Sequence, residues 1–306
     1  MLKESKKSNH SSKKVKEPKV YLQIKSSKTE KEVNIILTNI INGRYFNATL
    51  TLDSVEFGKY AQLIVTFLEQ YPENKYALFW LGRIYYCSLG EINKDLDKCL
   101  RYYTKSARLD YDLAMIQLAI LYLNYDGSTD VKYNTTIGIK YLEDCKSHSI
   151  EATDMLANIY RHGLKGVERD LERTLLYYEL NAKRKDIGAL KQLGIMYMEG
   201  ESGLEKDEKK AFAYFELAYN LCCGEVIVYL ARLYELGLGV EKNLRLAVLM
   251  YYRFNKFLIK CPQYNVPDWY VQFPEKIKKL CQSEPIDMST IIIELLNYYP
   301  MPYFLT

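Results

Sequence analysis

Tyrosine recurs through the middle of the chain at an almost constant interval. Tyr85, Tyr122, Tyr160, Tyr197 and Tyr234 are separated by 37, 38, 37 and 37 residues. A leucine four residues before each tyrosine, and a glycine or alanine after each leucine, keep the same interval. A period of this length is typical of stacked supersecondary units, which bury their apolar faces against neighbouring units.

The repeated residues predict one helix at the start of each unit. Alanine, leucine and tyrosine at i, i+4 and i+8 lie along one helix face, as Ala152, Leu156 and Tyr160 do in the third unit. Three later glycines each follow such a tyrosine by three residues: Gly163, Gly200 and Gly237. Helices commonly end on a left-handed glycine, so we expect the first helix to stop there.

A second helix is predicted after each of these turns. Asp and Asn are favoured N-caps because the side chain accepts a hydrogen bond from an unpaired N–H of the first turn. The predicted caps are Asp95, Asn134, Asp170, Asp207 and Asn243. Each unit therefore consists of a helix, a capped turn, a second helix and a short connection.

The predicted fold class is all-α, a right-handed α/α solenoid of about five helix–turn–helix repeats, with a small β-hairpin near the N-terminus. The array is expected over residues 75–258, with units at 75–111, 112–149, 150–186, 187–223 and 224–258. Because solenoids need covered end faces, residues 19–74 and 259–306 are predicted to be caps, the second of them helical and including a helix over Ser289–Tyr299. The Lys- and Ser-rich residues 1–18 are expected to be a disordered basic tail.

The N-terminal cap has two interpretations. Asn42–Gly43, between β-branched and aromatic runs, indicates a hairpin. The alternative is a helix over residues 30–41. In either case Asp53 caps a predicted helix over 54–70, which Pro72 ends.

The last three units resemble the Sel1-like repeat family, a relative of the tetratricopeptide repeat. The segments that carry the resemblance are ATDMLANIYRHGLKGVERDLERTLLYYELNA from Ala152, ALKQLGIMYMEGESGLEKDEKKAFAYFELA from Ala189 and VYLARLYELGLGVEKNLRLAVLMYY from Val228. The resemblance implies an adaptor that assembles protein complexes. Some members belong to amoeba-infecting bacteria or giant DNA viruses of amoebae, an origin that the 29 tyrosines also suggest. A secreted branch with paired cysteines has hydrolase-like activity, and this chain lacks the pairs.

Charge and cysteine content favour an intracellular protein. The net charge is +4, of which the residues up to Glu32 carry +6, so the remainder carries −2. The Lys- and Ser-rich first residues are not expected to act as a secretory signal, and no apolar run approaches the roughly 18 residues of a membrane span. The seven cysteines, including the adjacent Cys222 and Cys223, are expected to be reduced core thiols. A cytoplasmic location is expected, with nuclear import through the basic tail as an alternative.

No residue pattern indicates catalysis, a cofactor or a metal, because the three histidines share no ligand spacing with cysteine pairs. The expected partner is a protein or peptide of unknown identity on the concave face. The alternative, nucleic-acid binding through the basic tail, is less favoured because the array is near neutral. The predicted partner-binding residues lie on the first helices: Phe79, Arg83, Tyr86, Ile116, Ile120, Leu123, Asp154, Asn158, Arg161, His162, Lys191, Ile195, Met198, Val228, Arg232 and Glu235. Alternatively, the N-terminal cap covers the apolar ones.

Overall fold

The computed structural model describes residues 37–38, 41–42, 61–124, 131–201, 203–260 and 280. The chain divides into two compact units, residues 1–94 and 95–306, and the division falls inside the first predicted repeat. The regular elements of the described residues are helices, with two isolated bridges, Leu164 to Val167 and Glu201 to Leu204. The all-α fold class is therefore confirmed.

The first unit contains α4 (Ala61–Leu68) and α5 (Lys75–Cys87). Helix α4 lies within the predicted helix over 54–70, whose residues 54–60 lie outside the described part of the chain. The Asn74 side chain caps α5 by accepting hydrogen bonds from the N–H groups of Tyr76 and Ala77, both at 3.0 Å. The Asn74 amide also donates to the Ile41 carbonyl at 2.9 Å, which ties the start of α5 to that residue.

The predicted β-hairpin falls almost entirely outside the described residues. Leu37, Thr38 and Ile41 are helical and Asn42 is in a turn. These few residues fit the alternative helix over 30–41 and not a strand. The basic tail over 1–18 and the helix over Ser289–Tyr299 also lie outside the described residues.

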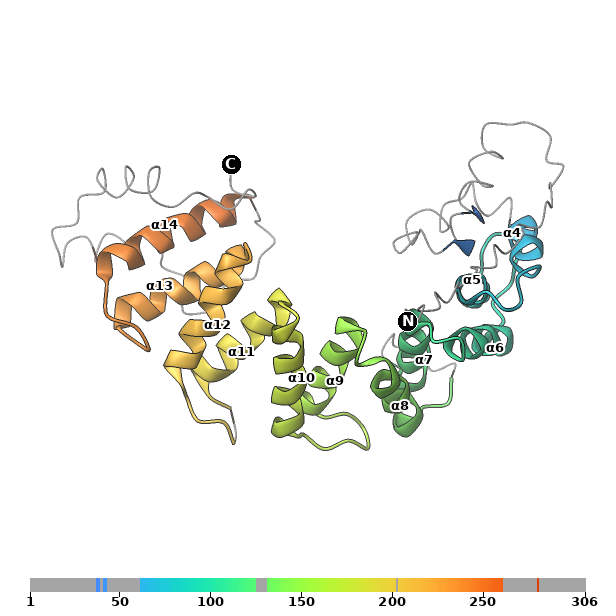
Figure 1. Cartoon of the computed structure of the whole chain (residues 1–306), viewed down its shortest axis with the longest axis horizontal. Coiled ribbons are helices and arrows are strands. Elements are labelled where there is room, and N and C mark those ends of the chain that lie inside the picture. Colours follow the sequence, from blue (N-terminus) through green and yellow to red (C-terminus); the bar gives the residue numbers. More distant parts are fainter. Residues whose placement is uncertain are drawn as a thin grey trace, which may run out of the picture. The chain divides into compact units, whose positions relative to one another are not determined.

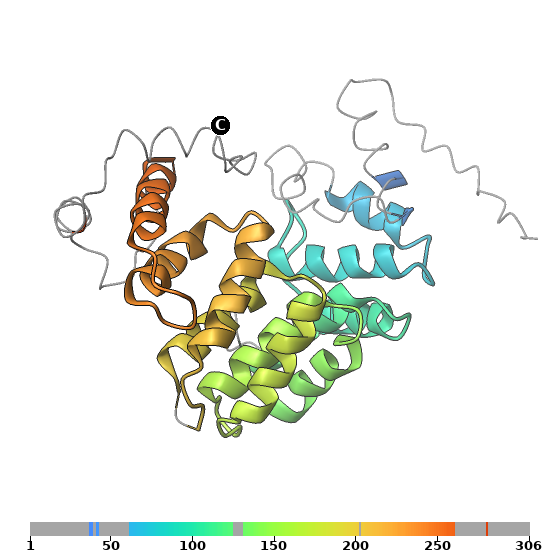
Figure 2. The same ribbon diagram turned by 60° about the vertical axis from the view of Figure 1, so that its left-hand side comes forward.

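The second unit is a series of helix pairs. Its helices are α6 (Leu96–Ala107), α7 (Asp112–Leu123), α8 (Thr135–Cys145), α9 (Ile150–His162), α10 (Leu171–Lys183), α11 (Ile187–Glu199), α12 (Glu208–Asn220), α13 (Ile227–Leu236) and α14 (Leu244–Lys260). A short 3₁₀ turn, Gly224–Val226, precedes α13. Each helix packs against the next one along the chain, as α9 to α12 show in both views (Figures 1 and 2). A first helix such as α11 therefore lies between two second helices, α10 and α12.

The repeated leucines and small residues form the core of the helix pairs. Leu118, Leu156 and Leu193 are fully buried. The small residue beside each leucine allows the paired helix to approach. At Gly194 a Cβ atom would lie only 2.5 Å from Cε1 of Phe215 on α12, so no larger residue fits without a shift.

The predicted capped turns are confirmed. The side chains of Asp95, Asn134, Asp170, Asp207 and Asn243 each accept a hydrogen bond from the N–H three residues later, at 2.9 to 3.0 Å. Gly163, Gly200 and Gly237 all have positive φ, of 74°, 72° and 68°. Only Gly237 has the left-handed helical conformation, because ψ is 165° at Gly163 and 155° at Gly200. Residues with a side chain rarely enter that extended, positive-φ region.

Candidate partner-binding surface

The predicted partner-binding residues occupy three positions on the first helices. The early position holds Phe79, Ile116, Asp154, Lys191 and Val228; the middle position holds Arg83, Ile120, Asn158, Ile195 and Arg232; the late position holds Tyr86, Leu123, Arg161, Met198 and Glu235. His162 follows the late position of the third unit and is exposed. All five middle-position residues are partly exposed.

Four of the predicted residues are core residues, so their expected exposure was wrong. Phe79, Ile116, Leu123 and Val228 are at most 5% exposed. In the second unit the reason is that each first helix packs between two second helices, which leaves only a narrow strip of its surface exposed. Phe79, in the first unit, packs edge-on against Trp80 with ring centroids 5.8 Å apart.

The remaining positions are partly exposed and change in chemistry from one repeat to the next. The early position changes from the acidic Asp154 to the basic Lys191. The middle position is occupied by Asn158, Ile195 and Arg232 in successive repeats, and the late position by Arg161, Met198 and Glu235. The leucine, the tyrosine and the Asp or Asn cap are kept in every repeat, whereas the residues of this strip differ.

Two of these residues connect neighbouring repeats. Arg161 on α9 pairs with Glu201, and its Nη1 donates to Oε1 of Gln192 on α11 at 2.9 Å. Burial would lower the pKa of Arg161, but the Glu201 carboxylate outweighs it and raises that pKa. One repeat later, the Lys191 ammonium lies 2.5 Å from a carboxylate oxygen of Glu225.

Asp154 lies in a less favourable electrostatic environment. Burial is the largest cause of the raised pKa of Asp154, and the nearby Asp186 carboxylate raises it further. The Asn158 amide, which donates to Oδ2 at 3.1 Å, partly offsets both effects. The charged form of Asp154 is therefore less stable in the folded chain than in water.

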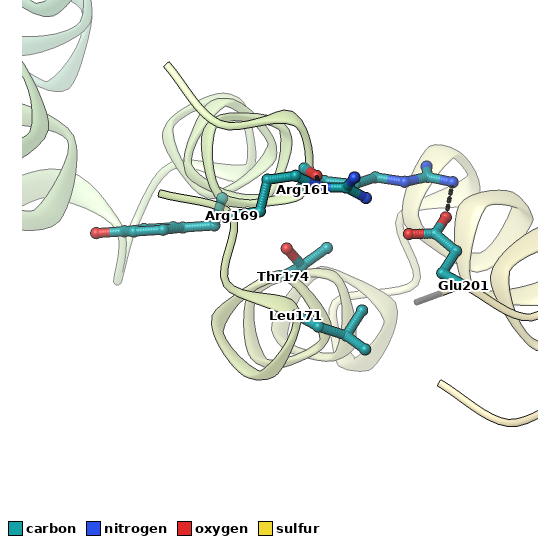
Figure 3. A pocket seen from close by; sticks show the side chains of 6 residues that line it. Arg161, Arg169, Leu171, Thr174 and Glu201 are labelled. Carbon is teal, nitrogen blue, oxygen red and sulfur yellow. Dashed lines mark hydrogen bonds and ion pairs between the residues drawn. The ribbon is translucent and has the colours of Figure 1, made fainter. Parts of the chain in front are cut away.

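A pocket lies beside Arg161, at the junction of the third and fourth repeats. We call it the first pocket; its volume is about 270 Å³ and its lining residues are Tyr160, Arg161, Arg169, Leu171, Thr174 and Glu201. Figure 3 shows Leu171 and Thr174 on α10 below the two arginine side chains, with Glu201 at the far end of Arg161. Nε of Arg169 donates to the Arg161 carbonyl at 2.9 Å, which holds the Arg169 guanidinium at this pocket.

A second pocket occupies the equivalent place one repeat later. It has a volume of about 330 Å³ and is lined by Met198, Glu199, Lys206, Glu208, Arg232, Leu233 and Leu238. Met198, Lys206, Glu208 and Leu238 stand 37 residues after Arg161, Arg169, Leu171 and Glu201, respectively. The repeat geometry thus forms the same pocket twice with different linings, a relationship that the sequence analysis missed although the 37-residue register contained it.

The sequence analysis also missed a buried polar network. The Thr153 hydroxyl donates to Oδ1 of Asn181 at 2.6 Å, and the Asn181 amide donates to the Ile150 carbonyl at 3.1 Å. Arg184 donates to the carbonyls of Lys146 and Ser147, both at 2.8 Å, after the end of α8. These bonds tie α10 and its C-terminal end to α9 and to the connection between α8 and α9, which is a structural role.

Two predictions for cysteine need correction. Cys87 and Cys222 are exposed, so they are not core residues, while Cys99, Cys145 and Cys223 are buried free thiols. Burial raises the pKa of Cys145 to about 12, which keeps this thiol protonated and unreactive. Cys222 adopts φ of 68° in the turn after α12, which places its side chain outside the core.

Two other kinds of site are absent from the described residues. No cluster of three or more His, Cys, Asp or Glu side chains suited to a metal ion occurs in the described ranges. Within the same ranges, no helix combines the length and the apolar character that a membrane crossing requires.

The Sel1 repeat family model matches residues 75–111, 112–143, 150–186, 188–221 and 225–254, more than half of the chain. The chain belongs to the Sel1 repeat family. Proteins of this family are generally protein-interaction scaffolds and are typically non-catalytic. The match includes the first two repeats, whose turns lack the glycine pattern of the later ones.

A curated yeast protein is similar to part of this chain. Chitin synthase regulatory factor 3 of Schizosaccharomyces pombe is 35% identical over 96 residues, which are 30% of this chain. The chain spans only about a tenth of the length of that curated relative.

A solved structure shows a similar fold. A Sel1 repeat protein of Oxalobacter formigenes matches with a TM-score of 0.53 and 26% identity, over 65% of this chain and 55% of that protein. A protective antigen of uropathogenic Escherichia coli with an SLR fold matches at 16% identity and a TM-score of 0.41, over 88% of this chain and 64% of the antigen. These yeast and bacterial relatives lend no support to the expected amoeba-associated origin.

Proposed function

We propose that this chain is a non-enzymatic scaffold that binds a peptide or protein partner along the partly exposed strip of its first helices. One observation carries the proposal: the framework residues repeat in every unit, whereas the exposed positions change. The middle position changes from Asn158 to Ile195 to Arg232 in the last three repeats. A surface that varies on a constant framework provides a different local contact in each repeat. We also propose that this strip lines the concave side of the array and that the protein acts inside the cell.

The exposed strip has the composition of a binding surface. Partly exposed apolar residues, Ile195 and Met198, lie beside the charged Lys191 and Arg232. Apolar side chains supply buried area at protein interfaces, and charged neighbours supply specificity and register. The strip therefore offers both the apolar and the charged contacts of a protein interface.

The test is affinity purification of the tagged full chain from its native cell, followed by mass spectrometry, with two matched variants. The test variant carries Ile120→Ser and Ile195→Ser on the first-helix strip, where both side chains are partly exposed. The control carries Leu176→Ser and Leu217→Ser on second helices, where the side chains are 60% and 52% exposed. We expect the test variant to lose proteins that the parent and the control retain. Equal recovery with all three chains would contradict the proposed surface.

A further inference from the structure

We infer that the two pockets form a tandem site for an extended acidic peptide, with a carboxylate side chain in the first pocket and a large apolar side chain in the second. This inference rests on the proposed function and gives it a site and a class of ligand. It uses the strip's late position, Arg161 and Met198, together with the adjoining turns.

The charges of the first pocket favour a carboxylate. Its lining contains two guanidinium groups, those of Arg161 and Arg169, and one carboxylate, that of Glu201. Arg161 is already bound by Glu201 and Gln192. One positive charge, on Arg169, is therefore left without a carboxylate in the lining.

Arg169 is positioned to receive that carboxylate. Its Nε is fixed on the Arg161 carbonyl at 2.9 Å, and its Nη1 and Nη2 form no hydrogen bond or ion pair with the described residues. A guanidinium held by one nitrogen presents the other two as a fork, which matches the geometry of a carboxylate. Ordering the side chain in advance also reduces the entropy that a ligand would lose on binding.

The second pocket favours an apolar anchor. Its charges balance, since Lys206 and Arg232 are matched by Glu199 and Glu208. Three apolar side chains complete the lining, Met198, Leu233 and Leu238, and Leu238 stands where the first pocket has Glu201. A ligand that follows the repeat would therefore meet a cation first and an apolar surface next.

The repeat spacing sets the distance between the two anchors. Consecutive first helices are separated by two helix packings of about 10 Å each. The two anchors are therefore about 10–20 Å apart, and an extended chain rises about 3.3 Å per residue. The expected ligand thus has an Asp or Glu and a Leu, Met or Phe separated by roughly three to six residues.

The test is selection from a positional-scanning library of eight-residue peptides on the full chain, with Kd values of the selected peptides measured by fluorescence polarisation. The parent should select Asp or Glu at one position and a large apolar residue about three to six positions away. Arg169→Ala should raise Kd roughly twofold to fivefold, because the ligand loses an ion pair with an exposed guanidinium, which solvent screens. The Kd of Arg169→Lys should lie between those of the parent and Arg169→Ala. Lys183 is exposed and outside both linings, so Lys183→Ala should have the Kd of the parent.

Three results would overturn the inference. These are selection with no acidic preference, an unchanged Kd for Arg169→Ala, or no peptide selected at all. The proposed function is judged separately, because the affinity purification also detects folded partners and depends on Ile120 and Ile195, which line neither pocket. Specific partners lost with the strip variant, together with no acidic peptide selected, would reject the tandem site and leave the scaffold in place.

Discussion

The backbone N–H of Asp170 donates to the carbonyl of Tyr160 at 2.8 Å, while the Asp170 side chain caps α10. One residue thus closes the turn between α9 and α10 and starts the second helix. The pair recurs as Asn134 with Tyr122, Asp207 with Tyr197 and Asn243 with Tyr234, at 2.8 to 2.9 Å. The cap is therefore a joint between the two helices of each unit as well as a local helix signal.

Asp170→Ala should destabilise the fold by about 1 kcal/mol, the usual cost of losing an N-cap. Asp170→Asn keeps the oxygen acceptor and should remain within a few tenths of a kcal/mol of the parent. Urea unfolding followed by circular dichroism measures both. Equal losses for Ala and Asn would show that charge, and not the capping hydrogen bond, is the important property.

Gly194→Ala should destabilise the fold by about 1–3 kcal/mol, because the new methyl group would overlap the Phe215 ring. Phe215→Leu alone should also cost stability, since that ring is fully buried. The double variant should lose less than the sum of the two single losses, because leucine vacates the space that the methyl group needs. If the free energies lost by the two single variants simply add up in the double variant, as measured by urea unfolding, the methyl group does not clash with the Phe215 ring.

Two positions after first helices should respond to substitution with opposite signs. Gly163→Ala forces a side chain into φ of 74° and ψ of 165° and should cost about 1–3 kcal/mol. Ser88 has φ of 59° and already bears the left-handed strain, so Ser88→Gly should leave stability equal or raise it by up to about 1 kcal/mol. Thermal unfolding of both variants tests the pair, and a loss at Ser88→Gly would contradict the assignment of strain there.

Asp154→Asn should stabilise the fold at pH 7 and have no effect at pH 3. The pKa of Asp154 is raised in the folded state, so the folded chain binds the proton more tightly than the unfolded chain. Stability contributed by this group is then lost as pH rises from its unfolded pKa through its folded pKa. Unfolding measured across pH 3 to 7 provides the test, with Asp144→Asn, exposed on α8, as control. A difference in the free energy of unfolding between Asp154→Asn and the parent that stays the same at every pH would contradict this prediction.

The 37-residue register predicted the helix pairs, the caps and the core leucines, because each depends on residues close together in sequence. It did not predict which first-helix residues are exposed. Helix α7 is apolar on nearly every side, so its sequence does not distinguish buried Ile116 from partly exposed Ile120. That distinction depends on packing between α6 and α8, which joins residues from different repeats.

The candidate site was less predictable for the same reason. Arg161 and Glu201 are 40 residues apart, and their pairing follows from the packing of one turn against the preceding repeat. Comparing lining residues one period apart reveals the tandem pockets, but only once the first pocket is known. The framework could be predicted from the sequence, whereas the contacts and pockets formed by residues of two adjacent repeats could be identified only in the structure.

The central claim is that partners contact the first-helix strip, and photo-cross-linking inside the native cell tests it most directly. A photoreactive phenylalanine analogue would replace Ile195 on the strip in one chain and Leu217 on α12 in another, and cross-linked proteins would be identified by mass spectrometry. The account predicts discrete cross-linked partners from position 195 and only background from position 217. Partners captured from position 217 and not from 195 would contradict it.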